Sequence, residues 1–139
     1  MAPAGKKDAP KTPNLTLEDW GRHVAFGVIC GSLTGFTVGA VDAFRMVKSG
    51  AVPRADAARV AFHEMGRSAV VVSAFFSVYQ TVKCLCLAAD VKYPEVRVGS
   101  ATAIAIAPVS VIAPLRRLVP YCLTLVAVDT YHTFFAPDR

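Results

Sequence analysis

Two opposite charges stand inside apolar segments of this sequence. Lys83 lies near the end of residues 68–89, and Asp129 lies near the end of residues 119–135. If both segments are helices that cross a bilayer in the same direction, both charges lie about 10–12 Å below the same surface. Charges at such depth are usually paired or functional, so we predict an intramembrane ion pair. The alternative is that Lys83 reaches the lipid headgroups while Asp129 meets water or a partner subunit.

The other reactive side chains form no catalytic pattern. The three histidines (His23, His63 and His132) are scattered, and no Ser or Cys has a basic partner nearby in sequence. The four cysteines (Cys30, Cys84, Cys86 and Cys122) lie in apolar segments without a CxxC pair, which argues against zinc. We expect buried thiols, with a disulfide from Cys30 to Cys84 or Cys86 as the alternative. The sequence therefore predicts no enzyme, no cofactor or metal site and no small-molecule substrate.

The composition is that of a membrane protein. Of 139 residues, 54% are hydrophobic and only 18% charged, and the mean hydropathy is +0.45. This balance is too apolar for an ordinary soluble domain. The net charge of +5 comes mainly from the tail and the connections, and basic residues do not alternate with aromatic ones. We therefore expect no nucleic-acid partner.

The hydropathy pattern predicts an all-α integral membrane protein with four transmembrane helices. A polar, proline-rich tail (1–16) precedes a transmembrane domain (17–136), and Thr16 with Asp19 resembles a capping box that starts a helix near Leu17. The expected spans are 23–41, 68–89, 98–114 and 119–135. Residues 103–107 alternate like a strand, but a lone strand in lipid would leave its backbone unpaired, so we expect a helix there.

The polar connection between the first two spans suggests one further element. Pro53 could open a short helix with Ala57, Val60, Ala61 and Met65 on one face. Such a helix would lie along the membrane surface or against a neighbour.

Four glycines follow one another at a spacing of four residues in the first span: Gly27, Gly31, Gly35 and Gly39. Each would cost a water-soluble helix about 1 kcal/mol relative to alanine. In lipid, small residues let helix backbones approach closely, so we predict that this glycine zipper packs against another helix. The third span repeats the spacing with Gly99, Ala103 and Ala107, for which we expect the same role. Neither GxxxxGK nor GxGxxG is present, which argues against a phosphate-binding loop.

Arg116 and Arg117 stand in the short turn between the last two spans. At a membrane surface they could bind an anionic lipid such as cardiolipin, or they could serve only to fix the topology.

These features together resemble the mitochondrial inner-membrane translocase family, which includes a four-helix accessory subunit of respiratory complex I. The resemblance covers residues 20–135: the glycine repeat, a polar loop, a second span with AFFSVYQTVKCL, a short charged connection, a small-residue third span and a basic turn. Translocase members carry more glycines in the third span, whereas this chain has only Gly99 and also Pro108. The departure favours the accessory subunit over a protein-conducting role.

The resemblance implies a multi-pass protein of the mitochondrial inner membrane with both termini in the intermembrane space. The excess of Lys and Arg in the two loops on the opposite side agrees with that orientation. It further implies a non-catalytic structural subunit whose partners are lipids and other membrane subunits of a large complex, namely NADH:ubiquinone oxidoreductase. The alternative is a component of the protein-import translocase.

Overall fold

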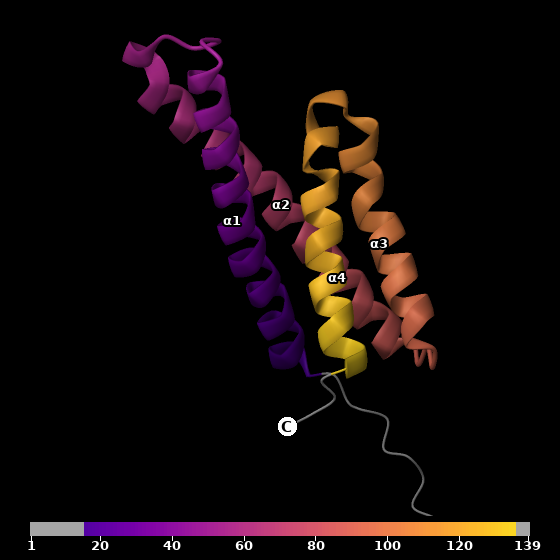
Figure 1. The fold of residues 1–139 in the computed structure, drawn as a ribbon. Coiled ribbons are helices and arrows are strands. Elements are labelled where there is room, and N and C mark those ends of the chain that lie inside the picture. The colour runs from indigo at the N-terminus through magenta and orange to yellow at the C-terminus, as the bar shows by residue number, and fades with distance from the viewer. Residues whose placement is uncertain (1–15, 136–139) are drawn as a thin grey trace, which may run out of the picture.

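The computed structural model describes residues 16–135, so the predicted tail lies almost wholly outside it. Within these residues the chain forms four α-helices and two short 3₁₀-helices, with no strand (Figure 1). The elements in order are α1 (Leu17–Lys48), η1 (Arg54–Asp56), α2 (Ala57–Ala88), α3 (Pro94–Val111), η2 (Ala113–Leu118) and α4 (Val119–Phe135). The prediction of an all-helical chain is confirmed, including the helical state of residues 103–107.

The predicted capping box at the start of α1 is confirmed. The Asp19 amide donates to Thr16 Oγ1 at 3.3 Å, and the Thr16 hydroxyl donates to the Asp19 carboxylate at 2.6 Å. These hydrogen bonds hold the pKa of Asp19 below its usual value. The Thr16 amide also donates to Asp19 Oδ2 at 3.4 Å, so the amides of Thr16 and Asp19, which the start of the helix leaves unpaired, both have partners, and α1 starts at Leu17.

The α1 and α2 helices form an antiparallel pair joined by a turn. Gly50 takes a φ of 74°, a conformation that glycine adopts without strain, and Pro53 precedes the single turn of η1. From Ala57 onward the chain is one continuous helix of 32 residues. The expected short surface helix at Pro53 is therefore wrong. Its residues form the first turns of α2, because no glycine or proline interrupts the helix until Gly66, which a helix interior tolerates.

The glycines of α1 lie directly on the backbone of α2. A Cβ atom added to Gly31 would lie 2.6 Å from the Cα of Ser73, and one added to Gly39 would lie 2.5 Å from the Cα of Met65. Gly27 meets the Phe76 carbonyl oxygen at 3.2 Å in the same way, and Gly35 faces Ala69. The Ser73 hydroxyl donates to the Val28 carbonyl oxygen at 3.3 Å, a bond that this approach permits. At Gly31, Gly35 and Gly39 the two helices are thus closer than a side chain would allow, and at Gly27 the fit is tight.

The second hairpin, α3 and α4, packs on α2 mainly through α3, and α4 also touches α1. Pro94 opens α3, and Ile112 and Pro114 mark its end, so α3 runs four residues earlier than the predicted span at its start. The α4 helix matches the predicted span 119–135. The core is centred on α2 and consists of residues from all four helices: Val38, Val72, Phe75, Phe76, Tyr79, Ala101, Ala105, Val109, Leu118, Cys122 and Val126.

The two long helices have the length and composition of membrane spans. Among the described residues, α1 and the segment Arg54–Ala88 are the helices that meet both criteria. At about 1.5 Å per residue, α1 and α2 are each about 48 Å long, whereas α3 and α4 reach about 26–27 Å. The two hairpins therefore differ in length. The longer one extends beyond the α3–α4 turn in Figure 1.

We predict that Gly31→Ala destabilises the protein by about 1–3 kcal/mol, because the added methyl group meets the backbone of α2, which cannot move aside locally. Unfolding of the detergent-solubilised chain, followed by circular dichroism, measures the change. Gly66→Ala is the matched control. Its added methyl meets nothing within 4 Å, so it should leave stability unchanged or raise it. Equal effects of the two substitutions would contradict the close approach of α1 and α2.

Candidate functional site: two ionic clusters on the central helix

The first ionic cluster joins α2 to α4 and contains the pair predicted from depth. Lys83 Nζ lies 2.5 Å from Asp129 Oδ2, and both side chains are largely buried. The structure thus brings these two residues together. The two residues lie at the same level on two parallel helices, as predicted. Their side chains also face each other across the α2–α4 contact.

Three further side chains complete this cluster. The Tyr79 hydroxyl donates to Asp129 Oδ2 at 2.8 Å, and Gln80 Nε2 donates to Asp129 Oδ1 at 3.2 Å. Lys83 also donates to the Thr133 hydroxyl at 3.2 Å. Both carboxylate oxygens of Asp129 therefore accept hydrogen bonds from donors of α2. The arrangement holds two helices together and is not one that activates a nucleophile.

The second ionic cluster joins α1, α2 and η2 near the opposite end of the helices. Arg117 donates to the Glu64 carboxylate and lies 3.6 Å from Asp42. Glu64 is only 8% exposed, and His63 approaches its second oxygen at 3.7 Å. A guanidinium with five N–H donors can serve both carboxylates, which a lysine would do less well.

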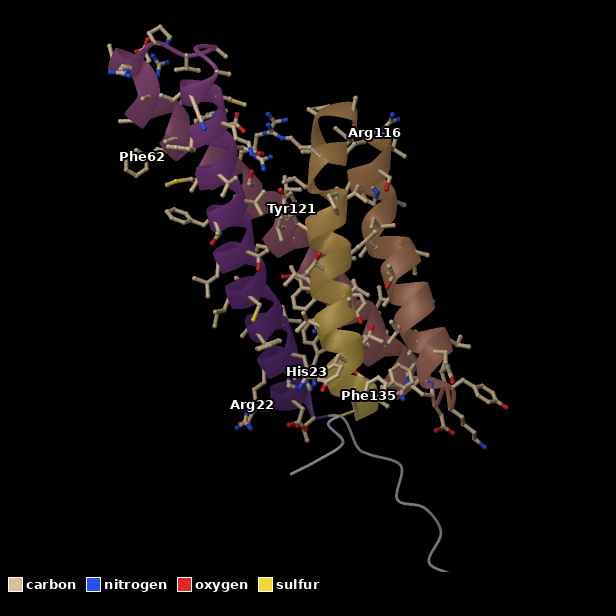
Figure 2. The ribbon with its side chains drawn as sticks, in the orientation of Figure 1. Arg22, His23, Phe62, Arg116, Tyr121 and Phe135 are labelled. Carbon is tan, nitrogen blue, oxygen red and sulfur yellow. The ribbon has the colours of Figure 1, made fainter. Side chains whose placement is uncertain are left out.

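The second cluster changes the interpretation of the two arginines in the turn. Arg117 forms ion pairs with two carboxylates of its own chain, which gives it a structural role that the sequence did not predict. Arg116 Nε donates to the Ser110 carbonyl oxygen at 2.8 Å, and its side chain points outward from the turn (Figure 2). The lipid-binding hypothesis remains a prediction for both arginines, and Arg116 has no carboxylate partner among the described residues.

The small residues of α3 are placed differently from those of α1. Gly99, Ala103 and Ala107 are exposed, and a Cβ atom on Gly99 would meet nothing within 4 Å. The face of α3 that packs on the rest of the chain is Ala101, Ala105 and Val109. The expected packing role of the first set within this chain is therefore wrong. A second stripe with the same spacing, two residues further on, takes that role.

The remaining candidate residues stay apart. All four cysteines are free thiols. Across residues 16–135, no group of three or more His, Cys, Asp or Glu side chains is placed to hold a metal ion. The sequence analysis missed Tyr79, Gln80, Asp42 and Glu64 as cluster members. The signal that could have found the first two is their distance of four and three residues from Lys83, which puts them on one helix face.

Comparison with models of protein families, with curated proteins and with solved structures gives no match to this chain. The resemblance to the inner-membrane translocase family therefore stays a prediction from the sequence.

We predict that Asp129→Asn destabilises the protein by about 2 kcal/mol, because it leaves the Lys83 ammonium without its carboxylate in a largely buried position. Adding Lys83→Gln to this variant should restore part of the loss. Detergent unfolding of the two single variants and the double variant gives the coupling between the residues.

Glu18→Gln is the control for that cycle. It removes an exposed ion pair with Arg22 and should change stability by less than about 0.5 kcal/mol. Additive effects of Asp129→Asn and Lys83→Gln would show that the ion pair contributes nothing to stability.

Proposed function

We propose that this chain is an integral membrane protein with four transmembrane helices and a glycine zipper in the first. The observation that carries the proposal is the distribution of polarity. Large apolar side chains cover the outside, including Ile29, Leu33 and Phe36 on the face of α1 opposite the glycines, while ionic groups lie between helices. In water, exposed apolar surface of this extent would be a liability. In hydrocarbon it is the expected outer surface.

The helix lengths support the same proposal. About 26–27 Å of α3 and α4 is close to the ~30 Å of a bilayer core. The longer helices α1 and α2 exceed this thickness by several turns. Inside α1 and α2, which contain no proline, the backbone polar groups are satisfied within each helix, as a lipid environment demands.

Within this membrane setting, we propose a non-catalytic structural subunit of a mitochondrial respiratory-chain complex, NADH:ubiquinone oxidoreductase. The charged groups between the helices are engaged with one another, and this suits a protein that holds neighbours in place. The large exposed apolar surface offers contact area to other membrane subunits and to lipids. The sequence resemblance supplies the name of the complex.

The alternative is a component of the mitochondrial protein-import translocase. A protein-conducting role needs a hydrated face lined with available polar groups. In this chain Arg117 and Asp129, the groups best placed to line such a face, are occupied by partners within the chain. We therefore place the structural role first.

We predict that the tagged chain, purified from mitochondria in mild detergent, co-migrates with NADH dehydrogenase activity on native gels. Co-migration with the import machinery would instead support the alternative. Extraction from membranes at alkaline pH without detergent would contradict the membrane proposal itself. The variant Gly31→Leu/Gly35→Leu should fail to enter the large complex, because it separates α1 from α2. Gly66→Leu, whose site is open within this chain, is the matched control.

A further inference from the structure

The loop end of the α1–α2 hairpin extends past the second hairpin and carries exposed cations (Figure 1). Arg117 contacts Asp42 and Glu64, so the α3–α4 turn lies level with these two residues. Residues of α1 after Asp42 and residues of α2 before Glu64 therefore lie beyond that turn. In this part Lys48 and Arg59 are exposed, and neither forms an ion pair among residues 16–135.

Two phenylalanines are exposed just beyond the level of the α3–α4 turn. Phe44 in α1 is 68% exposed, and Phe62 in α2 is 73% exposed. Phe44 follows Asp42 by two residues. Phe62 precedes Glu64 by two residues as well. Two residues correspond to about 200° around a helix, so both phenylalanines point away from η2, where Arg117 lies. Figure 2 shows Phe62 on the outer side of the hairpin, away from α4.

Each of these phenylalanines has a cation on the same face of its helix. Lys48 stands four residues after Phe44, and Arg59 stands three residues before Phe62. Residues three or four apart are neighbours on a helix surface. The contacts of the α1 glycines fix the register of α1 on α2, and this register puts the two phenylalanines within about 3 Å of one level and the two cations within about 5 Å of one level. We call Phe44, Lys48, Arg59 and Phe62 the tip patch.

In the membrane setting that we propose, the tip patch lies where hydrocarbon gives way to headgroups. The hydrocarbon core, at ~30 Å, is close to the length of α3 and α4, so it ends near the α3–α4 turn. The phenylalanines then lie about 3 Å beyond the turn, and the cations lie about 7–9 Å beyond it. The headgroup layer is about 5–7 Å thick on each side, and long basic side chains can reach back into it. The patch thus places its aromatic rings at the edge of the core and its positive charges among the headgroups.

The charge of the tip patch favours an anionic partner. Asp42 and Glu64 are engaged by Arg117 on the other side of the hairpin. Asp56 stands three residues before Arg59 and forms no ion pair with it. Neither cation of the patch therefore has a carboxylate partner among the described residues. A headgroup with a net negative charge would balance them, whereas a zwitterionic headgroup brings a cation of its own.

We propose that the tip patch binds one anionic phospholipid of the loop-side leaflet, whose phosphate lies between Lys48 and Arg59 and whose acyl chains pack on the two phenylalanines. An acidic protein segment would also attract the cations. The two exposed aromatic rings directly below them favour a molecule that continues into hydrocarbon. The inference rests on the membrane insertion proposed above, and it does not depend on which complex the chain joins.

Tryptophan fluorescence can test the site, because the single tryptophan of the chain, Trp20, lies at the opposite end of α1. The variant Trp20→Phe/Phe62→Trp moves the only tryptophan into the tip patch, and the unsubstituted chain is the control. Both proteins, in nonionic detergent micelles, are titrated with dibrominated phosphatidylglycerol or dibrominated phosphatidylcholine.

We expect phosphatidylglycerol to quench the Phe62→Trp protein saturably, at one lipid per chain. Half-saturation should come at a several-fold lower concentration than with zwitterionic phosphatidylcholine, and Trp20 in the control should show no saturable quenching. Equal quenching by the two lipids, or the same curve for both proteins, overturns the proposal.

A pair of charge variants in the Phe62→Trp protein separates the patch from the net charge of the loop end. Lys48→Gln/Arg59→Gln should raise the half-saturating concentration of phosphatidylglycerol about tenfold and remove the preference for it. The matched control, Arg45→Gln/Arg116→Gln, removes the same charge from the same end outside the patch and should leave binding unchanged. Equal weakening by both variants would show that charge alone attracts the lipid, and it would contradict the site.

Native mass spectrometry of chains that keep Phe62 provides a check without a probe in the patch. From an equal mixture of the two lipids, the unsubstituted chain should retain one more phosphatidylglycerol than Lys48→Gln/Arg59→Gln does, and equal retention contradicts the proposal. If this variant retains lipid normally but fails to enter the large complex, the patch serves an acidic partner subunit and the lipid proposal is wrong. Extraction of the chain at alkaline pH would overturn membrane insertion itself. A chain that resists extraction but shows no saturable quenching contradicts the lipid site alone.

Discussion

The close approach of the α1 and α2 backbones is the constraint on which the rest of the fold depends. It exists only because four successive positions of α1 on that side lack a side chain, so that Gly31 and Gly39 rest on Cα atoms of α2. In the membrane setting that we propose, lipid provides no hydrophobic force to press two helices together, and dispersion contact between backbones supplies the attraction. The glycines thus lower intrinsic helix stability and raise the stability of the pair. The pair then acts as a rigid base for the second hairpin.

The second hairpin is held by different means. Its contact with α2 is made by small and medium side chains such as Ala105 and Cys122, and it is fixed near both ends by ions. Lys83 with Asp129 ties α4 at one end, and Arg117 ties the α3–α4 turn to α1 and α2 at the other. Ionic contacts of this kind add direction as well as attraction, because a buried charge that lost its partner would be strongly unfavourable. A slide or rotation of α4 would break both clusters together.

The features of this structure that could be predicted from the sequence are those that depend only on the position of a residue along its helix. The matched positions of Lys83 and Asp129 along their helices predicted that pair, and the spacing of the glycines predicted that they share one face of α1. The sequence does not say how each helix is rotated about its own axis, and the remaining predictions depended on that rotation. In α3, two stripes of small residues have the same spacing, and nothing local distinguishes Gly99 and Ala103 from Ala101 and Ala105. The ion pairs of Arg117 were missed for a related reason, since Asp42 and Glu64 are remote from it in sequence.

The unequal hairpins also give the molecule two different ends. Because Arg117 meets Asp42 and Glu64, the α3–α4 turn lies level with those residues, and the later part of α1 and the first turns of α2 extend beyond it. This extension carries Arg45, Lys48, Arg54 and Arg59, none of which forms an ion pair within residues 16–135. At the other end Arg22 and Lys83 have carboxylate partners, whereas Lys92 and Arg97 form no ion pair within the same residues. By the positive-inside rule, loops that carry an excess of Lys and Arg next to membrane spans stay on the side from which the protein is inserted. The loop end thus carries more unpaired basic residues than the end where α1 begins. In the membrane setting that we propose, this difference favours the orientation expected from the resemblance, with the loops in the matrix.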